Sequence, residues 1–236
     1  MERAAIVTGG ARNIGQAISM RLLDDGFRVF ALDVETPEEA ALQADARRVD
    51  LSDPDATLNA VEEIVRQVPI GVLVCNVGVV KPASLAEVDL ADFDRVMYLN
   101  VRSALVAARA VLSSMRQQGG GRIVMNTSRV TRGKELRSLY SASKGAMQSM
   151  ARTWALETAG DGITVNCVAP GPIATSAFWD NNPRDAAQTR EIIEGVPVGR
   201  MGTPEDVANA VSFFCDDRAG FVTGQTLFVC GGVTVG

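Results

Sequence analysis

The sequence predicts an α/β fold, in which a single doubly wound parallel sheet of about seven strands carries helices on both faces. Short β-branched runs alternate with longer helical segments along the chain, which is typical of a parallel sheet. A glycine-rich turn joins the first of these runs to the first helical segment. The length of 236 residues and the apolar content of 47% suit one domain with a sizeable core. We therefore expect a single domain over residues 1–236.

The predicted strands are short runs rich in apolar and β-branched residues. They cover residues 4–7, 29–32, 49, 72–75, 122–126, 164–168 and 226–229. The predicted helices cover residues 14–25, 54–67, 90–117, 139–158 and 204–215. Gly26 follows the first helix and fits a C-terminal cap, and the three glycines at 119–121 end the long helix before the next strand.

The segment 175–199 interrupts this alternation. It is polar and contains an isolated aromatic pair, Phe178 and Trp179. Long polar segments between regular elements often border binding sites, so we predict a mobile substrate-loop insertion. The alternative is a pair of surface helices.

Charge and composition exclude several classes of function. The net charge of −5 argues against a nucleic-acid surface. No apolar run approaches the length expected of a membrane span, and the first predicted strand begins too early for a signal peptide. The four cysteines are scattered, which favours reduced core residues and a cytoplasmic location. The chain has no histidine, so the commonest metal ligand is missing and we expect no metal.

Tyr140 and Lys144 lie four residues apart in a chain with only two tyrosines and three lysines. In a helix this spacing places both side chains on one face. A nearby ammonium group favours the phenolate, so the pair predicts a tyrosine that acts as general acid or base near neutral pH.

A glycine-rich turn lies between the first predicted strand and the first predicted helix, at residues 8–15. Glycine lets the backbone approach a pyrophosphate, whose charge the helix N-terminus favours, so the turn predicts a dinucleotide site. Asn13 stands where a glycine is usual, and asparagine tolerates left-handed backbone geometry. A purely structural turn is the alternative. The candidate cofactor-binding residues are Gly9, Arg12, Asn13, Ile14 and Gly15.

Asp33 ends the second predicted strand and bears on the choice of coenzyme. A carboxylate at this place accepts hydrogen bonds from an adenosine ribose and repels a 2′-phosphate, which predicts NAD in preference to NADP. Arg12 favours NADP instead, because a cation in the turn could pair with that phosphate. A solvated turn charge is the alternative for Arg12.

Further motifs follow in order at the predicted strand ends. They are Asp50-Leu51, Cys75-Asn76-Val77-Gly78, the run from Pro170 to Thr175, and residues 222–232, in which Cys230 replaces a usual aspartate. Together with the glycine-rich turn and the Tyr140–Lys144 spacing, they make the chain resemble the short-chain dehydrogenase/reductase family over nearly its whole length. The resemblance implies a Rossmann fold.

The resemblance also implies roles for individual residues. Tyr140 is the expected proton donor or acceptor, Lys144 lowers its pKa and holds the nicotinamide ribose, and Asn100 anchors a proton-relaying water. Ser128 is the expected orienting hydroxyl, with Thr127 as the alternative from counting thirteen residues back from Tyr140. The remaining implied cofactor contacts are Asp50, Leu51, Asn76, Gly78, Pro170, Gly171, Ile173 and Thr175. The alternatives are a loop or N-cap hydroxyl for Ser128 and a helix-interior hydrogen bond for Asn100.

The predicted activity is therefore NAD-dependent interconversion of a secondary alcohol and a ketone, with a small-molecule substrate. The alternative is an NADP-dependent reductase of 3-oxoacyl thioesters, and the distant alternative is a non-catalytic nucleotide-binding protein. Members of the family usually form homotetramers through the helices that correspond to 90–117 and 139–158, so we expect a homotetramer.

The segment 129–137 borders the expected substrate pocket and contains four cations in nine residues. Arg129, with Arg132, predicts recognition of a carboxylate or sulfonate on the substrate. Phe178 and Trp179 predict an apolar or aryl wall. The alternative for the basic segment is a solvated or subunit-facing loop.

Overall fold

One parallel sheet of seven strands organises the chain. The computed structural model describes residues 3–235, apart from the side chain of Asn181. The strands lie side by side in the order β3-β2-β1-β4-β5-β6-β7. Their bounds are Ala4–Thr8, Arg28–Asp33, Arg47–Arg48, Ile70–Cys75, Gly121–Asn126, Ile163–Pro170 and Thr226–Val229, numbered β1 to β7. The predicted α/β fold class is confirmed, and the strand order reverses direction between β1 and β4, the place at which folds of this kind bind their ligands.

The central strands are buried on both faces, which explains why they read as continuous apolar runs. All residues of β1 and β6 are buried. The third strand is displaced from its predicted place: β3 ends at Arg48, one residue before Val49. Val49 still donates its backbone N–H to the carbonyl oxygen of Asp33 at 2.7 Å, so it extends the pairing that the strand begins.

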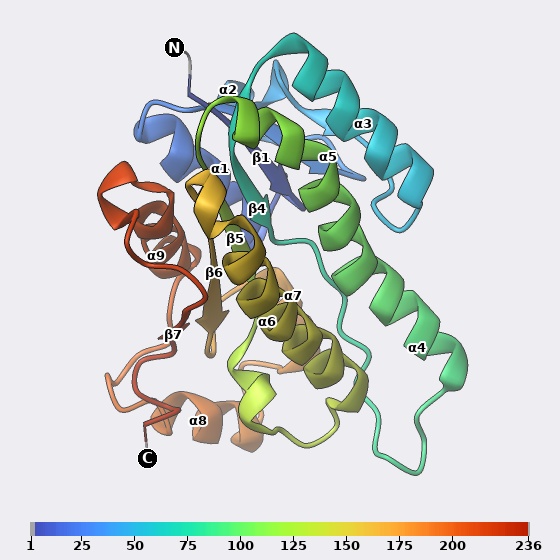
Figure 1. Ribbon diagram of the computed structural model, residues 1–236. Helices are drawn as coiled ribbons and strands as arrows, with labels where there is room; N and C mark the ends of the chain where they lie inside the picture. Colours follow the sequence, from blue (N-terminus) through green and yellow to red (C-terminus); the bar gives the residue numbers. More distant parts are fainter. Residues whose placement is uncertain (1–2, 236) are drawn as a thin grey trace.

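Helices cover both faces of the sheet, and each face has its own apolar cluster. On one face, α1 (Asn13–Asp24) packs against α9 (Pro204–Cys215). On the other, α3 (Pro54–Gln67), α5 (Ser103–Gln117) and α6 (Ser138–Thr158) lie side by side (Figure 1). The remaining regular elements are short: α2 (Ala40–Gln43) and 3-10 turns at Arg129–Arg132, Ala159–Asp161 and Asp217–Ala219.

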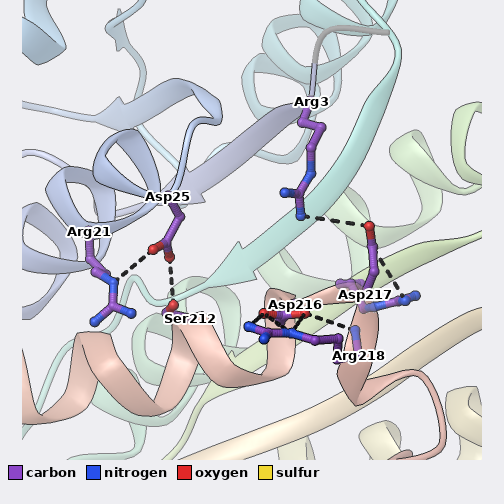
Figure 2. A network of polar contacts seen from close by, with 8 residues as sticks. Arg3, Arg21, Asp25, Ser212, Asp216, Asp217 and Arg218 are labelled. Atoms are coloured by element: carbon purple, nitrogen blue, oxygen red, sulfur yellow. Dashed lines mark hydrogen bonds and ion pairs between the residues drawn. The ribbon is translucent and has the colours of Figure 1, made fainter.

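Asp25 links α1 to α9 through polar contacts (Figure 2). One carboxylate oxygen lies 3.0 Å from Nε of Arg21, and the other accepts a hydrogen bond of 2.5 Å from Ser212. Asp25 directly precedes Gly26, whose φ of 86° ends the helix as predicted. The same carboxylate therefore stands at the end of one helix and fixes its neighbour.

The predicted helix 90–117 has three parts. It begins as α4 (Leu90–Met97), widens into a π-helical turn at Tyr98–Arg102, and continues as α5. A π turn inserts an extra residue into the helix and commonly lies at a functional site. Here it contains Asn100, whose side chain is fully buried.

Among the described residues, the helix Leu90–Gln117 is long and apolar enough to cross a membrane, judged by length and composition alone. The expectation that no apolar run reaches that length is therefore wrong for this segment. The core helix of a soluble protein passes the same test, and Ala107, Val111 and Met115 of this helix are buried in the core cluster beside the sheet.

The segment 175–199 contains two short helices, α7 (Ser176–Asn181) and α8 (Ala187–Glu194). The structure therefore shows the helix pair that the sequence offered as the alternative to a loop. In Figure 1, α8 lies at the end of the molecule toward which the arrow of β6 points. This is the end at which the predicted site residues gather.

Candidate active site

The turn after β1 is built so closely that two of its residues must be glycine. Gly9 has a φ of 63°, and a Cβ on Gly15 would lie 1.8 Å from the carbonyl oxygen of Gly9. Asn13 has a φ of 51°, which confirms that this position adopts left-handed geometry. The turn thus brings the start of α1 directly against the end of β1.

The N-terminus of α1 fits the pyrophosphate of a dinucleotide. Its N-cap residue, Arg12, makes no side-chain capping bond, and no acidic residue lies in the first turn, which holds Ile14. The first backbone N–H groups of a helix need an acceptor, and the helix dipole favours an anion there. Both features suit a bound phosphate group.

Asn76 holds the glycine-rich turn against the end of β4. Its Nδ2 donates to the carbonyl oxygens of Thr8 at 3.1 Å and Gly9 at 2.9 Å. Its Oδ1 accepts a hydrogen bond of 2.8 Å from Asn126 at the end of β5. Because both ends of its amide are used by the protein, the side chain of Asn76 positions the cofactor turn.

Asp33 ends β2 with its carboxylate beside the same turn. Its Oδ2 accepts a hydrogen bond from the backbone of Ala11 at 3.1 Å, and its Oδ1 accepts one from the backbone of Glu35 at 3.3 Å. Arg12 pairs with the Glu35 carboxylate at 2.8 Å, so it is not merely a solvated charge. The sequence interpretation missed Glu35, which a search for acids near the end of the second strand would have found.

Asp50 and Leu51 follow β3 at the same edge, but their surroundings differ. Hydrogen bonds from the backbone and hydroxyl of Ser52 lower the pKa of the exposed Asp50 carboxyl. Leu51 is buried in the core cluster. Asp50 therefore presents an exposed carboxylate, whereas the Leu51 side chain packs in the interior.

Ser128, Tyr140 and Lys144 meet at the carboxyl end of β5. The Ser128 side chain lies close enough to Tyr140 to lower the pKa of its phenol. Thr127 instead donates its hydroxyl to the carbonyl oxygen of Val168 at 3.0 Å, within the sheet. The structure therefore selects Ser128 over Thr127. The Lys144 ammonium lies 5.7 Å from the centre of the Tyr140 ring, on the same face of α6 as predicted.

Burial governs the protonation of this pair. Burial raises the pKa of Tyr140 to about 12, and the Ser128 side chain and the charge of Arg137 oppose that rise. Burial also lowers the pKa of Lys144 to about 8. The expectation that Lys144 lowers the pKa of Tyr140 is therefore not met in this structure. The physical reason is that the ammonium is itself desolvated and donates to the Asn126 carbonyl oxygen at 2.8 Å.

Asn100 joins the loop after β4 to α6. Its Nδ2 donates to the Val79 carbonyl oxygen and to the Ser143 hydroxyl, both at 3.0 Å, and its Oδ1 accepts from the Val79 backbone at 2.8 Å. Gly78 lies between Asn100 and Lys144, since a Cβ there would be 3.2 Å from Oδ1 and 3.3 Å from Nζ. The structure thus brings Asn100 close to Lys144, and the side-chain amide of Asn100 forms hydrogen bonds with residues outside its own helix.

The segment after β6 packs against the end of β7 and leads into α7. Pro170 ends the strand, and Gly171 lies so close to the strand β7 end that a Cβ would be 2.7 Å from Cα of Cys230. Ile173 is buried and pairs with Gly202. Thr175 caps α7 by accepting a hydrogen bond of 3.1 Å from Phe178.

Asn13 also reaches across to the first residue of α7. Its Oδ1 accepts hydrogen bonds from the backbone of Ser176 at 3.1 Å and from its hydroxyl at 3.2 Å, and its Nδ2 lies 3.1 Å from the same hydroxyl. Asn13, which replaces the usual glycine, therefore joins α7 to the glycine-rich turn through hydrogen bonds. No sequence signal linked two residues so far apart in the chain.

The candidate substrate residues are separated into two groups. Phe178 and Trp179 pack edge to face in α7, with ring centres 5.0 Å apart, and Arg184 covers the Trp179 ring at 3.9 Å. Arg129 is half-buried in the turn directly after Ser128. The described residues contain no group of three or more His, Cys, Asp or Glu side chains able to hold a metal ion.

The fold and this arrangement define an oxidoreductase that binds a nicotinamide dinucleotide, and comparisons identify the family. A family model described as enoyl-(acyl carrier protein) reductase matches residues 9–234. A (2S)-[(R)-hydroxy(phenyl)methyl]succinyl-CoA dehydrogenase subunit from Thauera aromatica is 35% identical over 240 residues, covering 98% of this chain and 96% of the relative. The chain belongs to the short-chain dehydrogenase/reductase family.

Two further relatives illustrate the range of the family. An acetoacetyl-CoA reductase from Shinella zoogloeoides is 34% identical, with 98% of each chain covered. The crystal structure of a putative NAD(P)-dependent gluconate 5-dehydrogenase from Beutenbergia cavernae, with bound NADP, superimposes with a TM-score of 0.91. That protein is 33% identical, and the match covers 99% of this chain and 97% of the other.

The hydrogen bonds between Asn13 and Ser176 yield a stability prediction. Asn13→Gly keeps the positive φ but loses the bonds to Ser176, so it should cost up to about 1 kcal/mol of unfolding free energy and speed hydrogen exchange in α7. Asn13→Ala should cost about 1 kcal/mol more, because a Cβ disfavours the left-handed region. Urea denaturation and hydrogen–deuterium exchange test this. Unchanged exchange in α7 for both variants would contradict this link between Asn13 and Ser176.

Lys144→Met should stabilise the cofactor-free protein near neutral pH. The folded pKa of Lys144, about 8, lies below the usual value of 10.5, so the folded chain binds fewer protons between these values. The contribution of Lys144 to stability is therefore present above pH 10.5 and is lost as the pH falls through 8. Methionine has no charge to desolvate.

The stability gain from Lys144→Met should thus be roughly 2 kcal/mol larger at pH 7 than at pH 10. Urea denaturation of both proteins at the two pH values measures it. Lys81→Met, at a lysine outside the active site that pairs with Asp92, is the control and should show a much smaller pH-dependent difference. An equal gain at both pH values would show that Lys144 is not held with a lowered pKa.

Proposed function

We propose that this protein is an NAD-dependent oxidoreductase that interconverts a secondary alcohol and a ketone. The observation that carries the proposal is the meeting of Ser128, Tyr140 and Lys144 beside a dinucleotide turn at one end of the sheet. Retention of both the tyrosine and the lysine argues against a non-catalytic nucleotide-binding role.

In this proposal the cofactor supplies hydride transfer and the chain supplies orientation and a path for the proton. Tyr140 donates a proton to the carbonyl oxygen in reduction and takes the hydroxyl proton in oxidation. Ser128, whose side chain lies beside Tyr140, holds the same substrate oxygen. Lys144 binds the nicotinamide ribose, and the proton leaves from Lys144 past Asn100.

The preference for NAD rests on two acids. Asp33 is held beside the turn by backbone hydrogen bonds, where it can accept from the ribose hydroxyls. Glu35 forms an ion pair with Arg12, and this pairing competes with any pairing of Arg12 with a 2′-phosphate. Both acids repel a 2′-phosphate, so the charge around the adenosine ribose favours NAD, although the Beutenbergia structure contains NADP.

A second candidate is an NADP-dependent reductase of 3-oxoacyl thioesters. The names of the family model and of the Shinella and Thauera relatives favour acyl thioesters. The same catalytic residues would serve, since a 3-oxoacyl thioester presents a ketone to Tyr140. Activity with acetoacetyl-CoA and each coenzyme separates the two candidates.

We further propose a cytoplasmic homotetramer. All four cysteines are free and buried, which suits a reducing compartment. Large apolar side chains stay exposed along α4, the π turn, α5 and α6, and a partner subunit would cover them. They are Leu90, Phe93, Tyr98, Leu105 and Leu156. Light scattering on the purified protein measures the assembly.

Tyr140→Phe should lower kcat roughly 10³-fold while the dissociation constant for NAD stays near the wild-type value, because only the proton is lost. Loss of Lys144 should damage both kcat and coenzyme binding. Tyr98→Phe, at the only other tyrosine, is the matched control and should leave turnover intact. A Tyr140→Phe variant with substantial turnover would refute the assigned role.

Coenzyme choice gives a second test of the proposal. Wild-type kcat/KM should be higher with NADH than with NADPH. Asp33→Ala should shift the preference by about tenfold toward NADPH, and adding Glu35→Gln should shift it further by releasing Arg12. Glu38→Gln, an exposed acid nearby, should change neither value. A wild-type protein that prefers NADPH would overturn the NAD assignment.

A further inference from the structure

Two cations flank the catalytic pair closely. Arg129 directly follows Ser128, and Arg137 lies one helical turn before Tyr140, as the N-cap residue of α6. Both side chains are half-buried. The Arg137 charge lowers the pKa of Tyr140, so the guanidinium acts on the hydroxyl that would meet the substrate oxygen.

Lys134 joins these two arginines in one cluster. It lies between them in the same loop, and its pKa is lowered by burial and by the charges of Arg137 and Arg129, so the three positive charges repel one another. Within residues 3–235, none of the three has a carboxylate oxygen within 4.0 Å, and Glu135 in the same loop pairs with none of them. Three cations held together with no counter-ion favour a bound anion.

The loop that carries the cluster is fixed at several points. The backbone of Ala83 donates to the Leu136 carbonyl oxygen at 3.2 Å, and Ala83 pairs with Arg137 as an isolated bridge. The hydroxyl of Ser141 donates to the Val130 carbonyl oxygen at 2.8 Å. Because the loop backbone is anchored on both sides, its ordering does not have to accompany ligand binding, which lowers the entropy cost of binding.

Arg132 does not belong to this cluster. Its guanidinium lies over the Phe228 ring at 5.2 Å, a cation–π contact with β7. The pairing of Arg129 with Arg132 expected from the sequence is therefore replaced by Arg129 with Lys134 and Arg137. Arg132 becomes the natural control for the loop.

We propose that Arg129, Lys134 and Arg137 bind an anionic group of the substrate, so that the ketone or alcohol reaching Tyr140 carries a carboxylate, sulfonate or phosphate. This inference rests on the proposed function and names the substrate class of that site. The anion has two sources: the carboxylate of a small oxo acid, or the phosphates of a coenzyme A thioester. Guanidinium groups bind either by paired charge-assisted hydrogen bonds.

Two matched substrate pairs test the proposal and separate the sources. The first is acetoacetate against its methyl ester; the second is acetoacetyl-CoA against the neutral N-acetylcysteamine thioester of acetoacetate. In at least one pair, wild-type kcat/KM should be about tenfold higher for the anionic member, as expected for one charge-assisted contact. That advantage should shrink as salt is raised. The pair that shows it identifies the source.

Arg129→Gln and Arg137→Gln should each raise KM for the favoured anionic substrate about tenfold and leave KM for its neutral partner unchanged. Lys134→Gln should act the same way. Arg132→Gln should change neither KM. Thermal unfolding confirms that each variant is folded.

Equal losses on anionic and neutral members, or no wild-type preference in either pair, would overturn the anion site while leaving the proposed function standing. No turnover of any of the four substrates with NADH or NADPH would overturn the proposed function, and the anion site with it.

Discussion

The architecture of the site depends on one chain of hydrogen bonds that crosses the sheet. It runs from the Thr8 and Gly9 carbonyl oxygens through the side-chain amides of Asn76 and Asn126, and the Asn126 backbone carbonyl oxygen accepts a hydrogen bond from the Lys144 ammonium. These groups lie at the carboxyl ends of β1, β4 and β5 and in α6. Because Asn126 bonds to Asn76 through its side chain and to Lys144 through its backbone, the position of the glycine-rich turn is coupled to that of the lysine.

Burying Tyr140 and Lys144 costs free energy, which other interactions of the folded chain must offset. Burial raises the pKa of Tyr140 and lowers the pKa of Lys144, and both shifts favour the neutral side chain. A buried ammonium is unfavourable unless it is hydrogen-bonded, and here it has the Asn126 carbonyl oxygen. Chemistry at this centre thus depends on groups that the fold keeps away from water, as is common at sites that move protons. The π turn at Asn100 places a third polar residue in the same buried region.

Much of the fold was readable from the sequence, because each buried parallel strand is a short apolar run and each helix has its own periodic face. The errors lie where local pattern is weak. β3 has only two residues, both of them arginines, so the apolar pattern places the strand at Val49 and not at Arg47–Arg48. The π turn has no distinctive composition, and the segment 90–117 reads as one helix. The short helices α7 and α8 are polar, which is why a loop was expected there.

The sequence by itself determined the fold class, the cofactor turn and the Tyr140–Lys144 pair, since these depend on spacing along one element and on glycine geometry. Tertiary structure alone decided which hydroxyl faces the tyrosine, because Thr127 and Ser128 differ only in the direction that β5 gives them. It also decided that Asn13 bonds to Ser176, that Glu35 pairs with Arg12, and that Arg132 lies over the Phe228 ring. Such contacts join distant elements, and no local pattern records which side chains packing will bring together.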